Sequence, residues 1–102
     1  MITFYDILKE NLKIPVIYTT YKGEPPRPPF IAYKATGQDR FLADDTIFLK
    51  ENTYRLEYYF ENKDEDLESQ IEYILLSNNL IYSKSGDIYL ESENVSLIYY
   101  EV

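Results

Sequence analysis

The clearest pattern in the chain lies in residues 51–68, where an alternation of apolar and polar positions gives way to a helical spacing. Successive residues of a strand point to opposite faces, so the alternation predicts a strand over residues 51–61. Asn62 is expected to cap the helix that follows, because Glu65 stands three residues on and can reach back to the cap. The expected apolar face comprises Tyr54, Leu56, Tyr58 and Phe60, and the polar face comprises Thr53, Arg55, Glu57 and Glu61.

The N-terminal part of the chain predicts one helix, one strand and a stiff loop. Thr3 suits the cap of a helix over Phe4–Asn11, and Pro15 stops this helix because the residue before a proline is pushed out of the helical region. Residues 15–21 are rich in β-branched and aromatic side chains and predict a short strand. Residues 22–29 contain four prolines, and we interpret them as a surface connection in preference to a ligand for an SH3-like domain.

Two extended segments are expected between this loop and the alternating strand. Residues 30–36 predict a strand, residues 37–39 its turn, and residues 41–48 a further extended piece. Asp44 and Asp45 lie in that piece. A calcium loop needs further oxygen ligands at defined offsets, which are absent, so the two aspartates favour an exposed turn.

After the alternating strand, the pattern predicts a second helix over residues 63–77. Residues 80–84 and 87–91 resemble two short strands about a Ser-Gly turn signal. Residues 95–102 are apolar on both faces, which is typical of a strand that is central in its sheet or covered by a partner.

We therefore expect a single α+β domain over residues 1–102: one mixed or antiparallel sheet with two helices packed mainly on one face. The expected order is α-β-β-β-β-α-β-β. This order has two strands after the second helix, although three segments there, residues 80–84, 87–91 and 95–102, have the character of strands.

Composition excludes much catalytic chemistry. The 102 residues include no cysteine and no histidine, so the commonest general base and the usual zinc ligands are missing. No phosphate-binding loop, dinucleotide fingerprint or nucleophile elbow is found. Glu57 and Glu61 could form a carboxylate pair of the kind glycosidases use, but a solvated sheet face is the favoured interpretation. We expect no enzyme activity, no cofactor and no bound metal.

The N-terminus lacks the basic start and apolar run of a secretory signal, and no segment approaches the roughly 20 apolar residues of a membrane span. We expect a soluble protein without membrane contact. The net charge is −8, with seven Lys or Arg and six acids in residues 1–50, and three against twelve in residues 51–102. A nucleic-acid binder needs a basic patch, and none is visible. The seventeen aromatic residues favour strand packing and subunit contact over base stacking.

Several landmarks together resemble a known family of small phage and prophage proteins. They are the Pro28-Pro29-Phe30-Ile31-Ala32-Tyr33 segment, the Ala43-Asp44-Asp45 element, Tyr54-Arg55-Leu56-Glu57-Tyr58-Tyr59-Phe60, Lys63-Asp64, Leu67-Glu68, Ile88-Tyr89-Leu90-Glu91-Ser92-Glu93, and Ser96-Leu97-Ile98-Tyr99-Tyr100-Glu101. Their order and spacing are similar to those of tail terminator, or tail completion, proteins of long-tailed phages of Gram-positive bacteria. The chain has Glu65 where the family pattern has proline, a departure at a helix start.

The resemblance implies a structural virion protein with the α+β terminator fold. It implies a ring of six copies at the head-proximal end of the tail, with the tail tube protein and the head connector as partners and DNA only as transiting cargo. The location implied is the virion tail, and the host cytoplasm during assembly. Candidate contacts with subunits or partners are Glu24, Pro25, Pro26, Arg27, Asp44, Asp45, Arg55, Glu57 and Glu61.

Two alternatives stay open at this point. One is a different head-to-tail joining protein, such as a stopper, since ring proteins of the neck share size and composition. The other is an acidic inhibitor that mimics DNA and binds an enzyme acting on nucleic acid.

Overall fold

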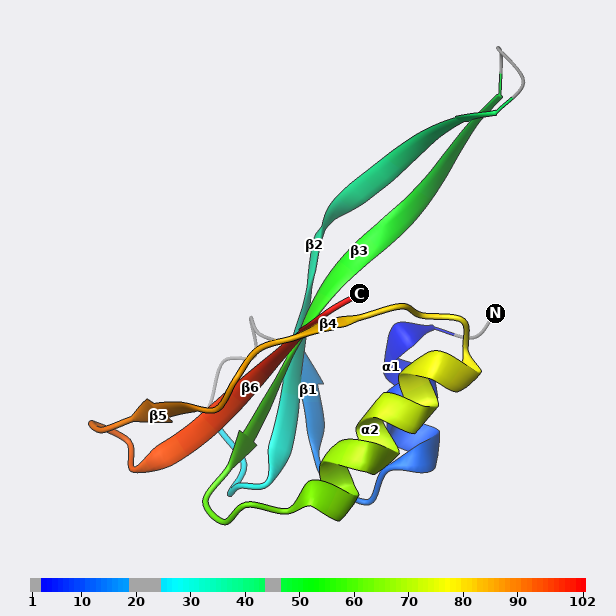
Figure 1. Cartoon of the computed structure of the whole chain (residues 1–102). Coiled ribbons are helices and arrows are strands. Elements are labelled where there is room, and N and C mark those ends of the chain that lie inside the picture. Colours follow the sequence, from blue (N-terminus) through cyan, green and yellow to red (C-terminus); the bar gives the residue numbers. More distant parts are fainter. Residues whose placement is uncertain (1–2, 19–24, 44–46) are drawn as a thin grey trace.

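Two helices lie on one face of a six-stranded mixed sheet, which confirms the expected α+β fold class (Figure 1). The structure, a computed structural model, describes residues 3–18, 25–43 and 47–102, and within these it describes residues 38–43 and 47–52 by their backbone alone. Neither helix of this part is long and apolar enough to cross a membrane. The elements are α1 (Phe4–Asn11), β1 (Val16–Tyr18), β2 (Phe30–Ala43), β3 (Ile47–Phe60), α2 (Glu65–Ser77), β4 (Ser83–Lys84), β5 (Ile88–Leu90) and β6 (Val95–Glu101).

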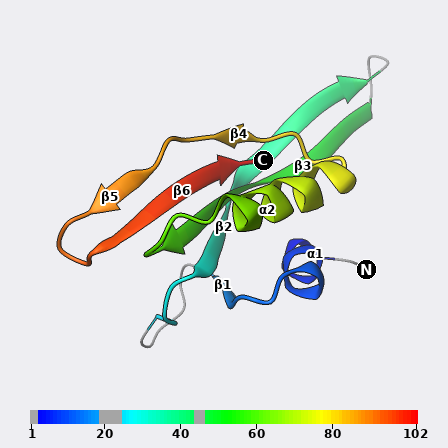
Figure 2. The ribbon, with the colours of Figure 1, turned by 60° about the horizontal axis from the view of Figure 1, so that its bottom comes forward.

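The sheet has the strand order β1-β2-β3-β6-β4, and β5 also pairs with β6. Only β1 and β2 are parallel, so the sheet is mixed. Strand β6 lies between β3 and the short strands β4 and β5, as its two apolar faces predict (Figure 2).

The core forms between the helices and the face of the sheet that carries the even-numbered residues of β3. Leu56 and Tyr58 are fully buried there, and Phe60 nearly so, which confirms the predicted apolar face. Their sheet neighbours Ile98 and Tyr100 are also fully buried. The helices supply Phe4, Leu8, Ile71, Ile74 and Leu75 to the same cluster.

The first helix has the predicted bounds and the predicted cap. The Thr3 hydroxyl accepts a hydrogen bond from the Asp6 N–H, and the Asp6 carboxylate accepts one from the Thr3 N–H. The second helix begins at Glu65, two residues later than expected. Asp64, and not Asn62, is its cap, because the Asp64 carboxylate accepts the hydrogen bond of the Leu67 N–H.

The predicted turn at residues 37–39 is wrong, because β2 runs without interruption from Phe30 to Ala43. The register between β2 and β3 shifts between Ala35 and Gly37, and Gly37 has a φ of 149°, so the glycine supplies a bulge within the strand. The extended piece expected over residues 41–48 is therefore the end of β2 and the start of β3, as their backbone pairing shows.

This correction also changes the order of elements, which is α-β-β-β-α-β-β-β. The expected order had one strand too many before α2, because it split the two long strands into three pieces. It had one too few after α2, where three strands form. Strand β1 covers Val16–Tyr18 of the expected residues 15–21, and residues 19–21 lie outside the described part.

The long hairpin of β2 and β3 projects beyond the rest of the sheet as an arm, which we define as residues 37–43 and 47–53 (Figure 1). Strand β1 pairs only with residues 31–33 of β2. On the other edge, the last support is the pair of backbone hydrogen bonds between Tyr54 and Val102. Within the described chain the arm is thus two strands wide, and the molecule measures 51 × 28 × 27 Å.

Candidate functional site

The sheet face opposite the helices carries the odd-numbered residues of β3 and holds a cleft of about 570 Å³. Pairing places Glu57 of β3 between Ala32 of β2 and Tyr99 of β6, so this carboxylate stands in the middle of the face. The proline-rich loop forms one wall of the cleft and the turn between β5 and β6 contributes to another. Lining residues include Pro25, Pro26, Phe30, Glu57, Tyr59 and Glu93.

Aromatic packing and one hydrogen bond hold Glu57 in place. The Tyr59 hydroxyl donates to Glu57 Oε1 over 3.1 Å, and the Tyr59 ring stacks on Phe30 with the ring centroids 4.7 Å apart. Burial raises the pKa of Tyr59 to about 12, and the neighbouring Glu57 charge acts in the same direction. Tyr59 is a neutral hydrogen-bond donor at physiological pH, and this hydrogen bond orients the Glu57 carboxylate.

The described lining contains two carboxylates, those of Glu57 and Glu93, and no lysine or arginine. Its remaining members are apolar or aromatic. A cleft of this composition suits a partner group that has an apolar body and a positive charge. No group of three or more Asp, Glu, His or Cys side chains among the described residues could hold a metal ion.

Arg55 lies two residues before Glu57 on the same face, but it is already engaged. Its guanidinium lies 3.8 Å from the centroid of the Tyr99 ring, and its Nε is 3.7 Å from Glu101 Oε1. It lines a separate, smaller pocket with Lys84 and Ser85. Arg55 thus lies beside the cleft, and its guanidinium does not neutralise the cleft carboxylates.

No family model, curated protein or solved structure matches the chain. Its function must be inferred from its own surfaces and from the sequence pattern.

The structure brings together three of the nine predicted contact residues, namely Pro25, Pro26 and Glu57. Arg27 is exposed in the same loop without lining the cleft. Glu61 lines a different pocket with Tyr58 and Phe60, so the Glu57 and Glu61 carboxylates do not share a site. The remaining predicted contacts, Glu24, Asp44 and Asp45, lie outside the described residues.

Two polar members of the cleft, Tyr59 and Glu93, are not among the contacts predicted from the sequence. Tyr59 could have been found, because the same alternation that places Glu57 on the polar face places Tyr59 there too. Glu93 could not, since only the pairing of β6 with β3 and β5 carries its turn to this face.

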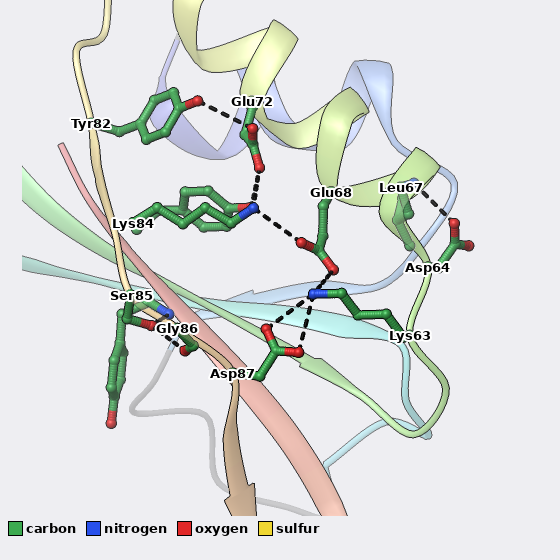
Figure 3. Close-up of polar contacts among 12 residues, drawn as sticks. Lys63, Asp64, Leu67, Glu68, Glu72, Tyr82, Lys84, Ser85, Gly86 and Asp87 are labelled. Atoms are coloured by element: carbon green, nitrogen blue, oxygen red, sulfur yellow. Dashed lines mark hydrogen bonds and ion pairs between the residues drawn. The ribbon is translucent and has the colours of Figure 1, made fainter.

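A second group of polar side chains joins the start of α2 to the chain around β4 (Figure 3). Glu68 is 3% exposed, and its two oxygens lie 2.8 Å from Lys63 Nζ and 3.0 Å from Lys84 Nζ. Lys63 also binds Asp87 at 3.0 Å, and Lys84 binds Glu72 at 2.7 Å. We call these five residues the charge network.

The electrostatics of the network favour its charged form. Burial raises the pKa of Glu72, but hydrogen bonds from Lys84 and from the Tyr100 hydroxyl outweigh it and leave the pKa lowered. The Glu68 carboxylate, helped by Asp87, raises the pKa of Lys63 to about 12. The network alternates in sign, and each of its charged groups lies within ion-pair distance of an opposite charge, so its main role is to stabilise the fold.

Alkaline pH should unfold the protein through its buried tyrosines. Burial raises the pKa of Tyr58 and the pKa of Tyr59 to about 12 each. Burial also raises the pKa of Tyr100 well above its ordinary value. A folded-state pKa above the unfolded value of about 10 contributes stability below pH 10, and this contribution is lost as the pH rises through 12. We expect tyrosinate absorbance and far-ultraviolet circular dichroism to show a shared late transition between about pH 10 and 12.

The Tyr58→Phe variant provides the control for this titration. It should remove part of the late absorbance change and leave the early change as in the wild type. A single early ionisation of all twelve tyrosines with unchanged circular dichroism would contradict the prediction.

Proposed function

We propose that this protein is a tail terminator, or tail completion, protein of a long-tailed phage. In this role it assembles as a ring, of six copies by the family pattern, on the last ring of the tail tube. The ring ends tube growth and presents a surface to the head connector. The assignment to phage tails is supported by the resemblance of the sequence landmarks, and the assembly of copies is supported by features of the fold.

The observation that carries the assembly part is the arm. A two-stranded hairpin alone is marginally stable in water, and stability normally needs a third strand or a covering helix. Within the described chain, no third strand pairs with the arm and no helix covers it, because the pairing of the outer strands ends at Tyr54 and Tyr33. Its outer edges expose unpaired backbone groups, which are a template for contact with another chain. Covering the arm with a neighbouring subunit would satisfy both needs.

The body of the protein offers further contact surface. The cleft lined by Pro25, Pro26, Phe30, Glu57, Tyr59 and Glu93, which we call the open-face cleft, is mostly apolar with a few polar groups, as many binding surfaces are. Large apolar side chains are also exposed on α2 and in the segment after it, with Ile81 86% exposed and Tyr73 73% exposed. A ring subunit between a tube and a connector needs several such surfaces, because each copy contacts two neighbours and two other proteins.

The connection between β3 and α2 and the turn between β5 and β6 both lie at the end of the sheet away from the arm (Figure 1), and both contain exposed acidic residues. The exposed acids there are Glu61, Asp64, Glu65, Asp66, Glu91 and Glu93. An acidic surface repels DNA, and a ring that DNA must traverse benefits from a wall to which DNA does not adhere.

Electron microscopy of purified tail tubes mixed with the protein tests the proposal. We expect a ring at one end of each tube, and tubes that stop growing at a defined length when tube protein is present in excess. Density on the connector alone would favour the stopper. Failure to bind tubes, together with tight binding to a DNA-processing enzyme, would contradict the proposal and favour the DNA mimic. A monomer in free solution is compatible with the ring, since assembly on the tube brings the copies together.

A further inference from the structure

The open-face cleft holds two carboxylates and no group of opposite charge. Apart from Glu57, Tyr59 and Glu93, the residues that line it are apolar, and none of the described lining residues is a lysine or an arginine. Glu57 is half-buried. A carboxylate in apolar surroundings is stabilised when a cation pairs with it. The cleft therefore has the charge and the walls to receive a cation that is carried on an apolar stem.

The hydrogen bond from Tyr59 decides which cation suits Glu57. The Tyr59 hydroxyl donates to Glu57 Oε1 over 3.1 Å, and no described residue donates to Glu57 Oε2. An arginine fork binds a carboxylate best through both oxygens at once, whereas a lysine ammonium is a compact point charge that needs only one. One free oxygen therefore favours lysine.

The cations nearest to the cleft are placed where they do not neutralise it. Lys84 is held in the charge network, and Arg55 is paired with Glu101. Lys34 stands directly opposite Arg55 on the open face of the sheet, but it forms no ion pair with Glu57. The acids of the cleft thus have no partner among the described cations of their own chain.

A second copy of the chain is a poor source of the lysine. Lys9 and Lys13 are exposed, but Glu10 lies between them on the same helical segment. Arg27 is exposed in the proline-rich loop, and it is an arginine, which one free carboxylate oxygen suits less well. The charge of the cleft therefore points to a different protein as its partner.

The cleft is large enough for more than one side chain. Its volume of about 570 Å³ lies within the range of about 300–1,000 Å³ that holds drug-sized ligands. Pro25, Pro26 and Pro28 line one side, and a proline ring fixes the backbone φ, so this wall loses little conformational freedom when a ligand binds. A lysine stem and an apolar neighbour in its chain fit such a wall.

We propose that the open-face cleft binds a lysine side chain, flanked by apolar residues, of a protein other than this chain. The ammonium pairs with Glu57 and Glu93, and the stem packs against the proline wall. Tyr59 is the positioning residue, because it orients Glu57. Binding of the lysine does not depend on the proposed function. In the proposed ring the partner is the tube protein, and this identification alone rests on that function.

A nuclear magnetic resonance titration of the free protein with short peptides tests the site. The probe is acetyl-Val-Lys-Val-amide, and the same peptide with norleucine keeps the stem and lacks the ammonium. We expect the lysine peptide to shift the amide signals of Glu57, Tyr59 and Glu93 with a dissociation constant of about 1 mM, and the norleucine peptide to bind about tenfold more weakly. Equal binding of the two peptides, no binding, or shifts confined to other residues overturns the proposal.

Neutral variants test the role of the two acids. Glu57→Gln/Glu93→Gln keeps the shape of both side chains and should weaken binding of the lysine peptide about tenfold, with binding of the norleucine peptide unchanged. Glu65→Gln/Asp66→Asn is the matched control, because it removes the same charge from two exposed acids outside the cleft. An equal loss in the control would show attraction to the net charge of −8 and would overturn the specific site.

Tyr59→Phe separates positioning from packing. The variant keeps the ring that stacks on Phe30 and removes the hydroxyl that orients Glu57. We expect the dissociation constant of the lysine peptide to rise about two- to tenfold, and that of the norleucine peptide to stay the same. An equal effect on both peptides, or no effect on either, overturns the positioning role.

Carbodiimide cross-linking on tail tubes identifies the source of the lysine, because the reagent couples an amine directly to an adjacent carboxylate. We expect Glu57 or Glu93 linked to a lysine of the tube protein. With mixed isotope-labelled and unlabelled protein, a link to Lys9 or Lys13 of another copy would show that a second copy is the occupant and would overturn the proposal. No link at either glutamate in capped tubes would overturn the tube protein as the partner.

Failure of this inference and failure of the proposed function give different results. If the lysine peptide binds as expected but tubes are never capped, the site stands and the terminator role is wrong. If tubes are capped but the lysine peptide does not bind, the terminator role stands and the site is wrong.

Discussion

Removing the arm should abolish the proposed ring assembly and leave the body of the protein folded. The variant replaces residues 38–52 with an Asn-Gly turn that joins Gly37 to Thr53, which are paired directly across the hairpin. The described core lies entirely in the body, and the third-strand support from β1 and β6 ends before the arm begins. The shortened protein should therefore unfold cooperatively, as the wild type does, but should no longer form rings on tail tubes.

Electron microscopy of tail tubes measures whether rings form, and a urea denaturation curve measures whether the shortened protein still unfolds cooperatively. A variant that replaces only residues 44–46 with glycine and serine is the control, because it keeps every paired residue of the arm. Rings formed by the armless protein would show that the body alone makes the subunit contacts. Loss of cooperative unfolding would show that the arm belongs to the folding unit.

The Glu68→Ala variant should have a free energy of unfolding about 2–4 kcal/mol below that of the wild type. Glu68 is the buried centre of the charge network, and its removal leaves Lys63 and Lys84 facing each other without the carboxylate that separates them. Each lysine side chain is about a third or more exposed and can turn to solvent, which keeps the loss below that of a fully buried pair. A shift in the midpoint of urea denaturation measures the loss.

The Glu65→Ala variant is the matched control, because it removes an exposed glutamate from the first turn of the same helix. We expect it to lower the free energy of unfolding by about 0.3–1 kcal/mol through the helix dipole alone. Glu68→Gln keeps the shape of the side chain and should fall between the two. A Glu68→Ala variant within about 0.5 kcal/mol of the wild type would contradict the structural role of the network.

Elements with strong local signals were predicted well. The alternation of β3 identified the buried face of Leu56, Tyr58 and Phe60, and the Thr3 cap identified the start of α1. In both cases the residues that determine the structure are close in sequence. The cap of α2 was misplaced, because Asn62 and Asp64 are both good capping residues and only the path of the chain out of β3 selects the second.

The turn expected at residues 37–39 shows where local signals mislead. Gly37 is followed by two polar residues, a composition typical of turns, yet the same composition fits a bulge when a partner strand lies alongside. The partner is β3, whose first half was expected to be a separate piece. The choice between turn and bulge depends on cross-strand hydrogen bonds, which no single segment can reveal.

The sequence by itself determined the fold class and the apolar faces of the main strands and helices. Only the tertiary structure decided that β2 and β3 continue into an arm, that Glu57 and Glu61 belong to different pockets, and that Glu93 joins Glu57 in the open-face cleft. The physical reason is the range of the interactions: side-chain periodicity and helix caps act within a few residues, whereas strand register and clefts arise from contacts between segments far apart in the chain.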